Sequence, residues 1–179
     1  SQNRQQRIKG VVGSGKTTIL AARAVEAYKR TKGKILILTY NITLKNYIHD
    51  KISQVRAEFP WENFIILNYH TFINNELNNL GVDVSVPEKF NELSLEQKEK
   101  YFESNYYSNK QLFTDNAETI VQYDAIFIDE IQDYKRPWME IIKEFFLVEG
   151  GEYVIFGDVK QNIYNNNQTE FKDVNTNVK

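Results

Sequence analysis

The chain has 179 residues, 41% of them hydrophobic and 26% charged, which is enough to bury the core of one compact domain and argues against global disorder. A formal charge of −2 excludes attraction to nucleic acid through an overall positive field, and the lack of cysteine excludes disulfides and thiolate metal sites. No run of about 18 apolar residues occurs, so we expect a cytoplasmic protein without a membrane partner.

Apolar runs alternate with helical stretches in the first seventy residues. This alternation predicts βα units and a mostly parallel sheet. We expect strands over Arg7–Val12, Lys34–Tyr40 and Asn63–Asn68, and helices over Thr17–Arg30 and Leu44–Val55. The second of these strands is continuously apolar, which is typical of a strand that is buried on both faces.

The pattern loosens between residues 74 and 122, where polar residues and short helical stretches predict a small helical insert. After the insert we expect a buried strand over Tyr123–Asp129, a helix over Arg136–Phe146 with Pro137 in its first turn, and a strand over Glu152–Asp158. Residues 165–179 are polar, and we expect a poorly ordered tail or the start of a linker there.

The segment from Gly10 to Thr17, GVVGSGKT, fits the phosphate-binding pattern G-x-x-x-x-G-K-[ST] at every position. Its glycines let successive backbone N–H groups converge on a phosphate at the positive end of the following helix. Lys16 would reach the β- and γ-phosphates, and the Thr17 hydroxyl would hold Mg²⁺. The alternative is a glycine-rich turn that binds nothing, which a preceding strand and a following helix disfavour. The predicted ATP-binding residues here are Gly10, Gly13, Ser14, Gly15, Lys16, Thr17 and Thr18.

Two adjacent acids, Asp129 and Glu130, follow the apolar run AIFI. The first can hold the Mg²⁺ that bridges two phosphates, and the second can orient an attacking water. In the alternative interpretation these acids, with Asp133, cap the next helix. A Glu directly after the Asp favours hydrolysis by water over phosphoryl transfer to another substrate.

A third polar motif, GDVKQNIY over Gly157–Tyr164, follows the last predicted strand. Together with GVVGSGKTT and DEIQD, in this order, it resembles motifs I, II and III of superfamily 1 helicases, and its form is similar to the UvrD/Rep branch. LTYN, over Leu38–Asn41, is similar to motif Ia. NYHTF, over Asn68–Phe72, is similar to the motif TFH, with Asn68 where Thr is usual.

The resemblance implies a P-loop NTPase with a RecA-like three-layer α/β fold and a mostly parallel sheet. Residues 1–73 and 123–164 would form the motor domain around a short 1B-like insert at 74–122.

The resemblance also implies ATP and Mg²⁺ as cofactors, Thr17 and Asp129 as metal ligands, and Lys16, Glu130 and Gln161 as catalytic residues. Gln161 would sense the γ-phosphate and couple it to the strand-binding surface, and Gln132 would help to link the two sites. Single-stranded DNA, rather than RNA, would be the partner, with 3′→5′ movement, and it would be contacted by Thr39, Tyr40, Asn41, His70 and Tyr164.

The chain also departs from the family. Gln5 and Gln6 lie too close to Lys16 to take the place of the adenine-recognising Gln, which lies well upstream in the family. The second RecA-like domain, with its arginines, does not follow, so we expect a fragment that is nearly inactive alone and that has this domain as a partner. A P-loop kinase and a non-catalytic nucleotide-binding module remain alternatives. Tyr40 and Tyr164 could instead be packing residues, and His70 could be a helix cap or a core residue.

Overall fold

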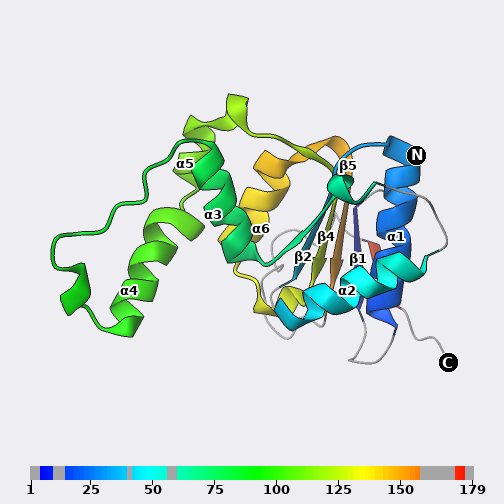
Figure 1. The fold of residues 1–179 in the computed structure, drawn as a ribbon, viewed down its shortest axis with the longest axis horizontal. Coiled ribbons are helices and arrows are strands. Elements are labelled where there is room, and N and C mark those ends of the chain that lie inside the picture. Colours follow the sequence, from blue (N-terminus) through cyan, green and yellow to red (C-terminus); the bar gives the residue numbers. More distant parts are fainter. Residues whose placement is uncertain (1–4, 10–14, 40–41, 56–59, 158–171, 176–179) are drawn as a thin grey trace.

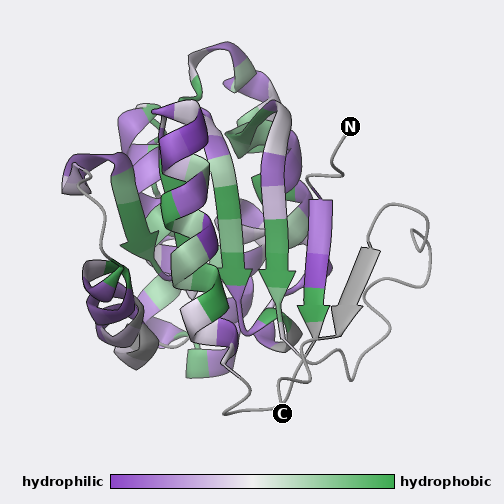
Figure 2. Cartoon of the chain, turned by 90° about the vertical axis from the view of Figure 1, so that its right-hand side faces the viewer, coloured by the Kyte–Doolittle hydropathy of each residue, from purple (hydrophilic) through white to green (hydrophobic). Residues whose placement is uncertain are grey.

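The computed structural model describes residues 5–9, 15–39, 42–55, 60–157 and 172–175. Its centre is a six-stranded sheet in the order β3-β2-β4-β5-β1-β6, and each neighbouring pair is parallel. Figure 2 shows the central strands as hydrophobic arrows that all point the same way. The strands are β1 (Gln5–Lys9), β2 (Ile35–Thr39), β3 (Phe64–Leu67), β4 (Tyr123–Asp129), β5 (Leu147–Phe156) and β6 (Lys172–Asn175).

Helices cover both faces of the sheet (Figure 1). One face carries α1 (Lys16–Thr31) and α2 (Ile42–Gln54). The other face carries α3 (Tyr69–Asn79) and α6 (Arg136–Ile141), which continues as a π-helix over Ile142–Phe146. These three layers confirm the predicted α/β fold with a parallel sheet.

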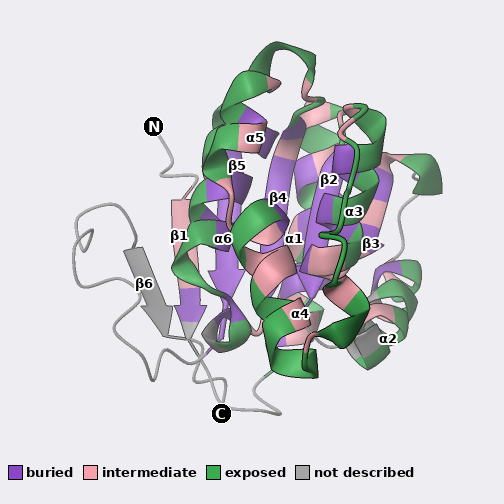
Figure 3. Cartoon of the chain, turned by 90° about the vertical axis from the view of Figure 1, so that its left-hand side faces the viewer, coloured by how far each residue is buried: buried purple, intermediate pink, exposed green. Residues whose placement is uncertain are grey.

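Alternate residues of each central strand feed two separate cores. On β2, Leu36 and Leu38 pack toward α3 and α6, whereas Ile35 and Ile37 pack toward α1. All four are fully buried, as Figure 3 shows for the middle of the sheet. This two-sided burial is the physical reason for the uninterrupted apolar run in the sequence.

The structure corrects the start of β5, which was predicted at Glu152. The strand begins at Leu147, beside Tyr123, and the register then jumps so that Glu152 lies beside Ala125. The extra residues form a bulge in which Gly150 adopts a left-handed φ of 70°. The predicted strand left out the two glycines before Glu152, because glycine in a strand marks a bulge and weakens the strand pattern.

Residues 74–122 are all described, and none of them lies in a strand. Their main elements are α4 (Leu95–Phe102), a π-helix over Glu103–Tyr107, and α5 (Lys110–Asp115). Ser94 and Gln97 cap α4 reciprocally through backbone and side chain. The predicted boundary at residue 74 falls inside α3, because the apolar face of that helix packs on the sheet along its whole length. We refer to residues 80–122 as the helical segment; its α4 end extends away from the sheet (Figure 1).

The predicted polar tail contributes a strand. Residues Lys172–Asn175 pair in parallel with β1 at the edge of the sheet. A polar sequence can form an edge strand because pairing needs only backbone groups on one side. Across the described parts of the chain, every helix is too short or too polar to traverse a lipid bilayer.

The amino ends of the central strands are tied together by polar contacts. Asp124, on β4, accepts a hydrogen bond from the backbone N–H of Lys34 at 2.8 Å. Asn63 donates to the carbonyl of Gly33, before β2, at 2.9 Å. A Cβ on Gly33 would lie 1.8 Å from the Asp124 carboxylate, so a larger residue there would displace this side chain. Nearby, Glu152 of β5 accepts from Arg30 of α1 at 2.7 Å.

Candidate nucleotide site

The candidate site lies where β1 ends and α1 begins, at the carboxyl edge of the sheet. β1 ends at Lys9, and Gly15 caps α1 with φ 81° and ψ 10°, a left-handed conformation that favours glycine. The first turn of α1 contains no acidic residue, so no side chain of that turn neutralises the partial positive charge of the helix start. Such a helix start suits an anion. The predicted residues Gly10, Gly13 and Ser14 lie outside the described residues.

Lys16 is the first residue of α1, and only 8% of its surface is exposed. Thr17 is half-buried and Thr18 is exposed. Burial raises the pKa of the Asp129 carboxyl, at the carboxyl end of β4, and the positive charge of Lys16 acts on that carboxyl in the opposite direction. The structure therefore brings together the first two predicted motifs, which are more than a hundred residues apart in the sequence.

Asp129 is 2% exposed, at the end of an apolar strand. The pKa of its carboxyl is raised to about 6, mainly by burial and in addition by the negative charge of Glu130. The backbone N–H of Glu130, which donates to Asp129 Oδ1 at 3.0 Å, and the charge of Lys16 oppose this rise. A buried carboxylate beside a buried lysine provides opposite charges for a metal ion and a phosphate.

Glu130 adopts φ 53° and ψ 50°, the left-handed region that non-glycine residues rarely occupy. Such a conformation costs on the order of 1–2 kcal/mol and persists where the surroundings enforce it. It separates β4 from a 3₁₀ turn over Ile131–Asp133. Backbone strain at the second acid of a predicted catalytic pair is typical of a functional site.

A comparison with known families agrees with this geometry. A family model described as AAA domain matches residues 1–167. The chain belongs to the AAA domain family. This AAA domain is a P-loop NTPase domain, a type found in UvrD/Rep-like helicases, and its general chemistry is the binding and hydrolysis of nucleotides. No curated protein matches the chain.

The oxygen donors of the AAA domain fit Mg²⁺ bound together with phosphates. Thr17 supplies a hydroxyl and Asp129 a carboxylate, both of them ligand types that Mg²⁺ prefers. Within the described ranges, no group of three or more His, Cys, Asp or Glu side chains lies close enough together to hold a metal ion. Mg²⁺ commonly takes one or two protein ligands and completes its shell with phosphate oxygens and water. The residues present therefore fit an ion that enters with the nucleotide.

The burial of Asp129 leads to a prediction about stability. The folded carboxyl, with its pKa of about 6, holds its proton more tightly than the unfolded one. Its ionisation costs stability that is absent below about pH 4, grows up to about pH 6 and stays constant above. Asp129→Asn is therefore expected to raise the free energy of unfolding of the AAA domain at pH 7 by about 2 kcal/mol. Urea denaturation without nucleotide or metal measures this change.

The matched control is Asp50→Asn, which changes an exposed carboxylate on α2 and is expected to leave stability unchanged. At pH 4 the gain from Asp129→Asn should shrink toward zero, because the wild-type carboxyl is then protonated in the folded state. An Asp129→Asn variant that is no more stable than the wild type at pH 7 would show that the buried charge of Asp129 does not destabilise the fold.

The structure corrects the predicted role of Thr39. This residue is fully buried and lies in register with Asp129 on the neighbouring strand. Its side chain therefore belongs to the interior beside the nucleotide site and presents no surface to a nucleic acid. The prediction failed because a threonine at a strand end has the same sequence pattern whether it points inward or outward.

His70 lies in the first turn of α3, which Asn68 caps by accepting from the N–H of Thr71 at 2.8 Å. Its ring is half-buried and meets Tyr107 edge-on at 4.5 Å and Trp138 edge-on at 4.8 Å. Burial lowers the pKa of His70; Glu103 opposes this effect and Lys135 adds to it. Asn68, at the unusual position of its motif, thus serves as the helix cap, and His70 packs in an aromatic cluster.

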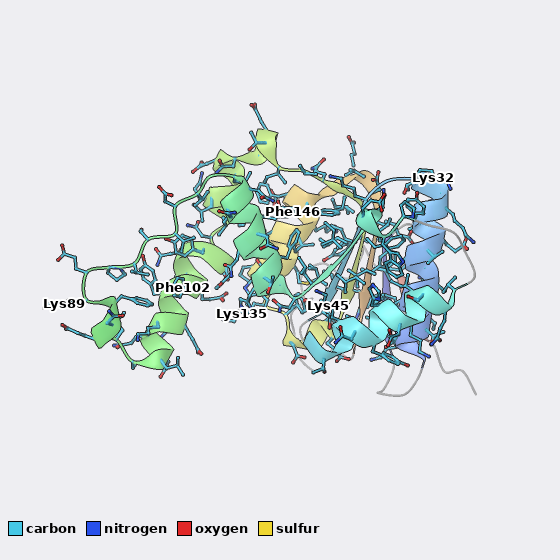
Figure 4. The ribbon with its side chains drawn as sticks, viewed as in Figure 1. Lys32, Lys45, Lys89, Phe102, Lys135 and Phe146 are labelled. Atoms are coloured by element: carbon cyan, nitrogen blue, oxygen red, sulfur yellow. The ribbon has the colours of Figure 1, made fainter. Side chains whose placement is uncertain are left out.

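A pocket of about 510 Å³ opens beside His70, between the helical segment and α6. Figure 4 labels Phe102 and Lys135, which lie on its two sides. Other lining residues include Trp138, Glu99 and Glu103. Sequence reasoning missed this pocket, because its walls come from the helical segment and from α6, which no sequence motif links. The pairing of Glu103 with Trp138 across 35 positions has no local sequence signal.

The remaining predicted residues Tyr40, Asn41, Gln161 and Tyr164 lie outside the described residues, as does the side chain of Gln132. The backbone of Gln132 lies in the 3₁₀ turn that follows Glu130. The structure thus brings Lys16, Asp129 and Glu130 to one edge of the sheet, near Thr17.

Proposed function

We propose that this AAA domain is the ATP-binding motor domain of a superfamily 1, UvrD/Rep-like DNA helicase or translocase. ATP hydrolysis would drive movement along single-stranded DNA, in the 3′→5′ direction. The observation that carries the proposal is the buried pair of Lys16 and Asp129, with the strained Glu130 directly beside it. The three motifs quoted above, in their order along the chain, support the choice of superfamily.

Each residue of the site has a role in this proposal. Lys16 binds the β- and γ-phosphates and is prepared for them by burial at a helix start. Thr17 and Asp129 would hold Mg²⁺, which supplies neutralisation of the charge that develops on the phosphates. Glu130 orients the attacking water and accepts its proton. Gln161 would respond to the γ-phosphate.

The nucleic-acid side of the proposal involves Tyr40, Asn41, His70 and Tyr164. Aromatic faces stack on any base, which suits a motor that ignores sequence. With a net charge of −2, the chain would hold single-stranded DNA by such local contacts rather than by its overall field. A second RecA-like domain would close the ATP site from the other side, and the helical segment would take the place of a 1B subdomain.

The test compares ATP hydrolysis by this chain with hydrolysis by the full-length protein that carries it, each with single-stranded DNA, single-stranded RNA or no nucleic acid. We expect slow turnover by the chain alone, since a completing arginine is worth about 10³–10⁵ in rate. We expect DNA-stimulated turnover by the full-length protein. Phosphoryl transfer to an acceptor other than water would indicate a kinase, and ATP binding without turnover in the full-length protein would indicate a binding module.

A further inference from the structure

The carboxylate of Glu103 connects the helical segment to the chain that leaves the acidic motif. Glu103 begins the π-helix after α4, and 18% of its side chain is exposed. Its Oε1 accepts from Trp138 Nε1 at 2.8 Å and from the hydroxyl of Ser108, and its Oε2 lies 3.6 Å from Lys135 Nζ. Two of these three partners, Lys135 and Trp138, follow Glu130 by only a few residues. We refer to the contacts of Glu103 with Lys135 and Trp138 as the latch.

Backbone hydrogen bonds close a turn on each side of the link between the acidic motif and the latch. The N–H of Asp133 donates to the carbonyl of Glu130 at 3.0 Å, and the N–H of Tyr134 donates to Ile131 at 3.1 Å. The N–H of Trp138 in turn donates to the carbonyl of Lys135 at 3.1 Å. The two turns are joined at Tyr134, which is buried and whose ring meets Trp138 edge-on at 5.8 Å. Through this contact a displacement of Trp138 would act on the 3₁₀ turn that follows Glu130.

The ring of Trp138 is held on its other side by the core. It stacks on Tyr69 at 4.4 Å with 13° between the planes and meets Tyr134 edge-on at 5.8 Å. Tyr69 donates its hydroxyl to the carbonyl of Tyr107, in the same π-helix that Glu103 begins. The helical segment therefore holds this stretch directly through the Glu103 carboxylate and indirectly through Tyr69 of α3, whose hydroxyl hydrogen bond it accepts. Among the described contacts, Glu103 makes the only ion pair between the helical segment and this stretch.

The strained backbone conformation of Glu130 depends on the contacts at both of its ends. A left-handed backbone at a non-glycine residue persists only where neighbouring contacts enforce it. One end of Glu130 is fixed by β4 and by its N–H bond to Asp129. The other end is fixed by the 3₁₀ turn and, through it, by the latch.

We propose that Glu103 is a positioning residue for the acidic motif: by holding Lys135 and Trp138 it keeps Glu130 in its left-handed conformation, and so sets the rate of ATP hydrolysis without setting the affinity for ATP. This inference rests on the proposed function. It extends that function, because it makes the helical segment a regulator of turnover: any ligand that moves the segment would act on Glu130.

The experiment compares Glu103→Ala with Glu103→Gln and with Glu99→Ala, a matched control on α4 that lines the same pocket. All variants carry Trp61→Phe, so that Trp138 is the only tryptophan of this chain's two and its emission reports on the latch. Calorimetry with Mg·ATP gives the affinity of the chain, and DNA-stimulated phosphate release by the full-length protein gives kcat and KM. Thermal melting verifies that each variant is folded.

For Glu103→Ala we expect an unchanged Kd for Mg·ATP, a red-shifted Trp138 emission, and a kcat that falls on the order of 10- to 100-fold, as small misplacements of catalytic groups do. Glu103→Gln keeps an acceptor for Trp138 but loses the ion pair with Lys135, so it should restore part of kcat. Glu99→Ala should match the Trp61→Phe parent.

A folded Glu103→Ala variant with normal kcat would overturn the inference and leave the proposed function standing, and so would a kcat loss that Glu99→Ala shares. A fall in melting temperature alone, with kcat unchanged, would give Glu103 a merely structural role. Failure of the parent chain to bind Mg·ATP would overturn both the inference and the proposed function.

Discussion

Lys16→Ala is expected to weaken the binding of Mg·ATP on the order of 100-fold, since a hydrogen bond to a charged group is worth about 1.5–3 kcal/mol and its loss leaves charge uncompensated. Lys16 is almost completely buried at the start of a helix. Its removal also takes away the positive charge that lowers the pKa of Asp129, which weakens the proposed metal ligand as well. Isothermal calorimetry on the 179-residue chain measures the effect.

The control for this prediction is Lys29→Ala. Lys29 lies on the same helix, is exposed and, among the residues that the structure describes, forms its ion pair with Glu26 at 3.2 Å, one helical turn away. This variant should bind Mg·ATP like the wild type. If Lys16→Ala, folded by circular dichroism, kept an affinity within a few-fold of the wild type, the nucleotide site would have to lie elsewhere.

Glu130→Gln is expected to leave ATP binding intact and to slow hydrolysis about 10²- to 10⁴-fold, the usual contribution of a positioned general base. The amide preserves size and backbone conformation but cannot accept the proton of the attacking water. Single-turnover release of phosphate by the full-length protein, with saturating single-stranded DNA, isolates the chemical step.

Asp133→Asn provides the comparison, because Asp133 is an exposed carboxylate three residues further along the same motif. In the interpretation of these acids as helix caps, both variants would have similar small effects. We expect Asp133→Asn to retain most of the activity. Equal rates for Glu130→Gln and the wild type would remove Glu130 from the mechanism.

The core of the fold was predictable from the sequence because parallel strands that are buried on both faces leave continuous apolar runs. β2 and β4 illustrate this, since Ile35–Thr39 and Tyr123–Asp129 agree with the prediction within a residue or two. β5 was predicted too short, because a bulge with Gly150 and Gly151 has the composition of a turn. β6 was missed because an edge strand needs no apolar side chains.

The site was predictable where a motif dictates the chemistry and not where tertiary packing does. Lys16 and Asp129 come together because the carboxyl ends of parallel strands share one edge, which follows from topology alone. The inward orientation of Thr39 could not be foreseen, nor could the left-handed backbone of Glu130. The latch at Glu103 depends on how the helical segment folds back, for which no local pattern exists.

The polar ties at the amino ends of the central strands have an evolutionary consequence. Asp124, Lys34 and the carbonyl of Gly33 secure the sheet at the edge opposite Lys16 and Asp129. Substitutions, insertions and exchanged loops on the reactive side would therefore leave these anchors untouched. A scaffold divided in this way can acquire new partners and new chemistry while its ability to fold is conserved.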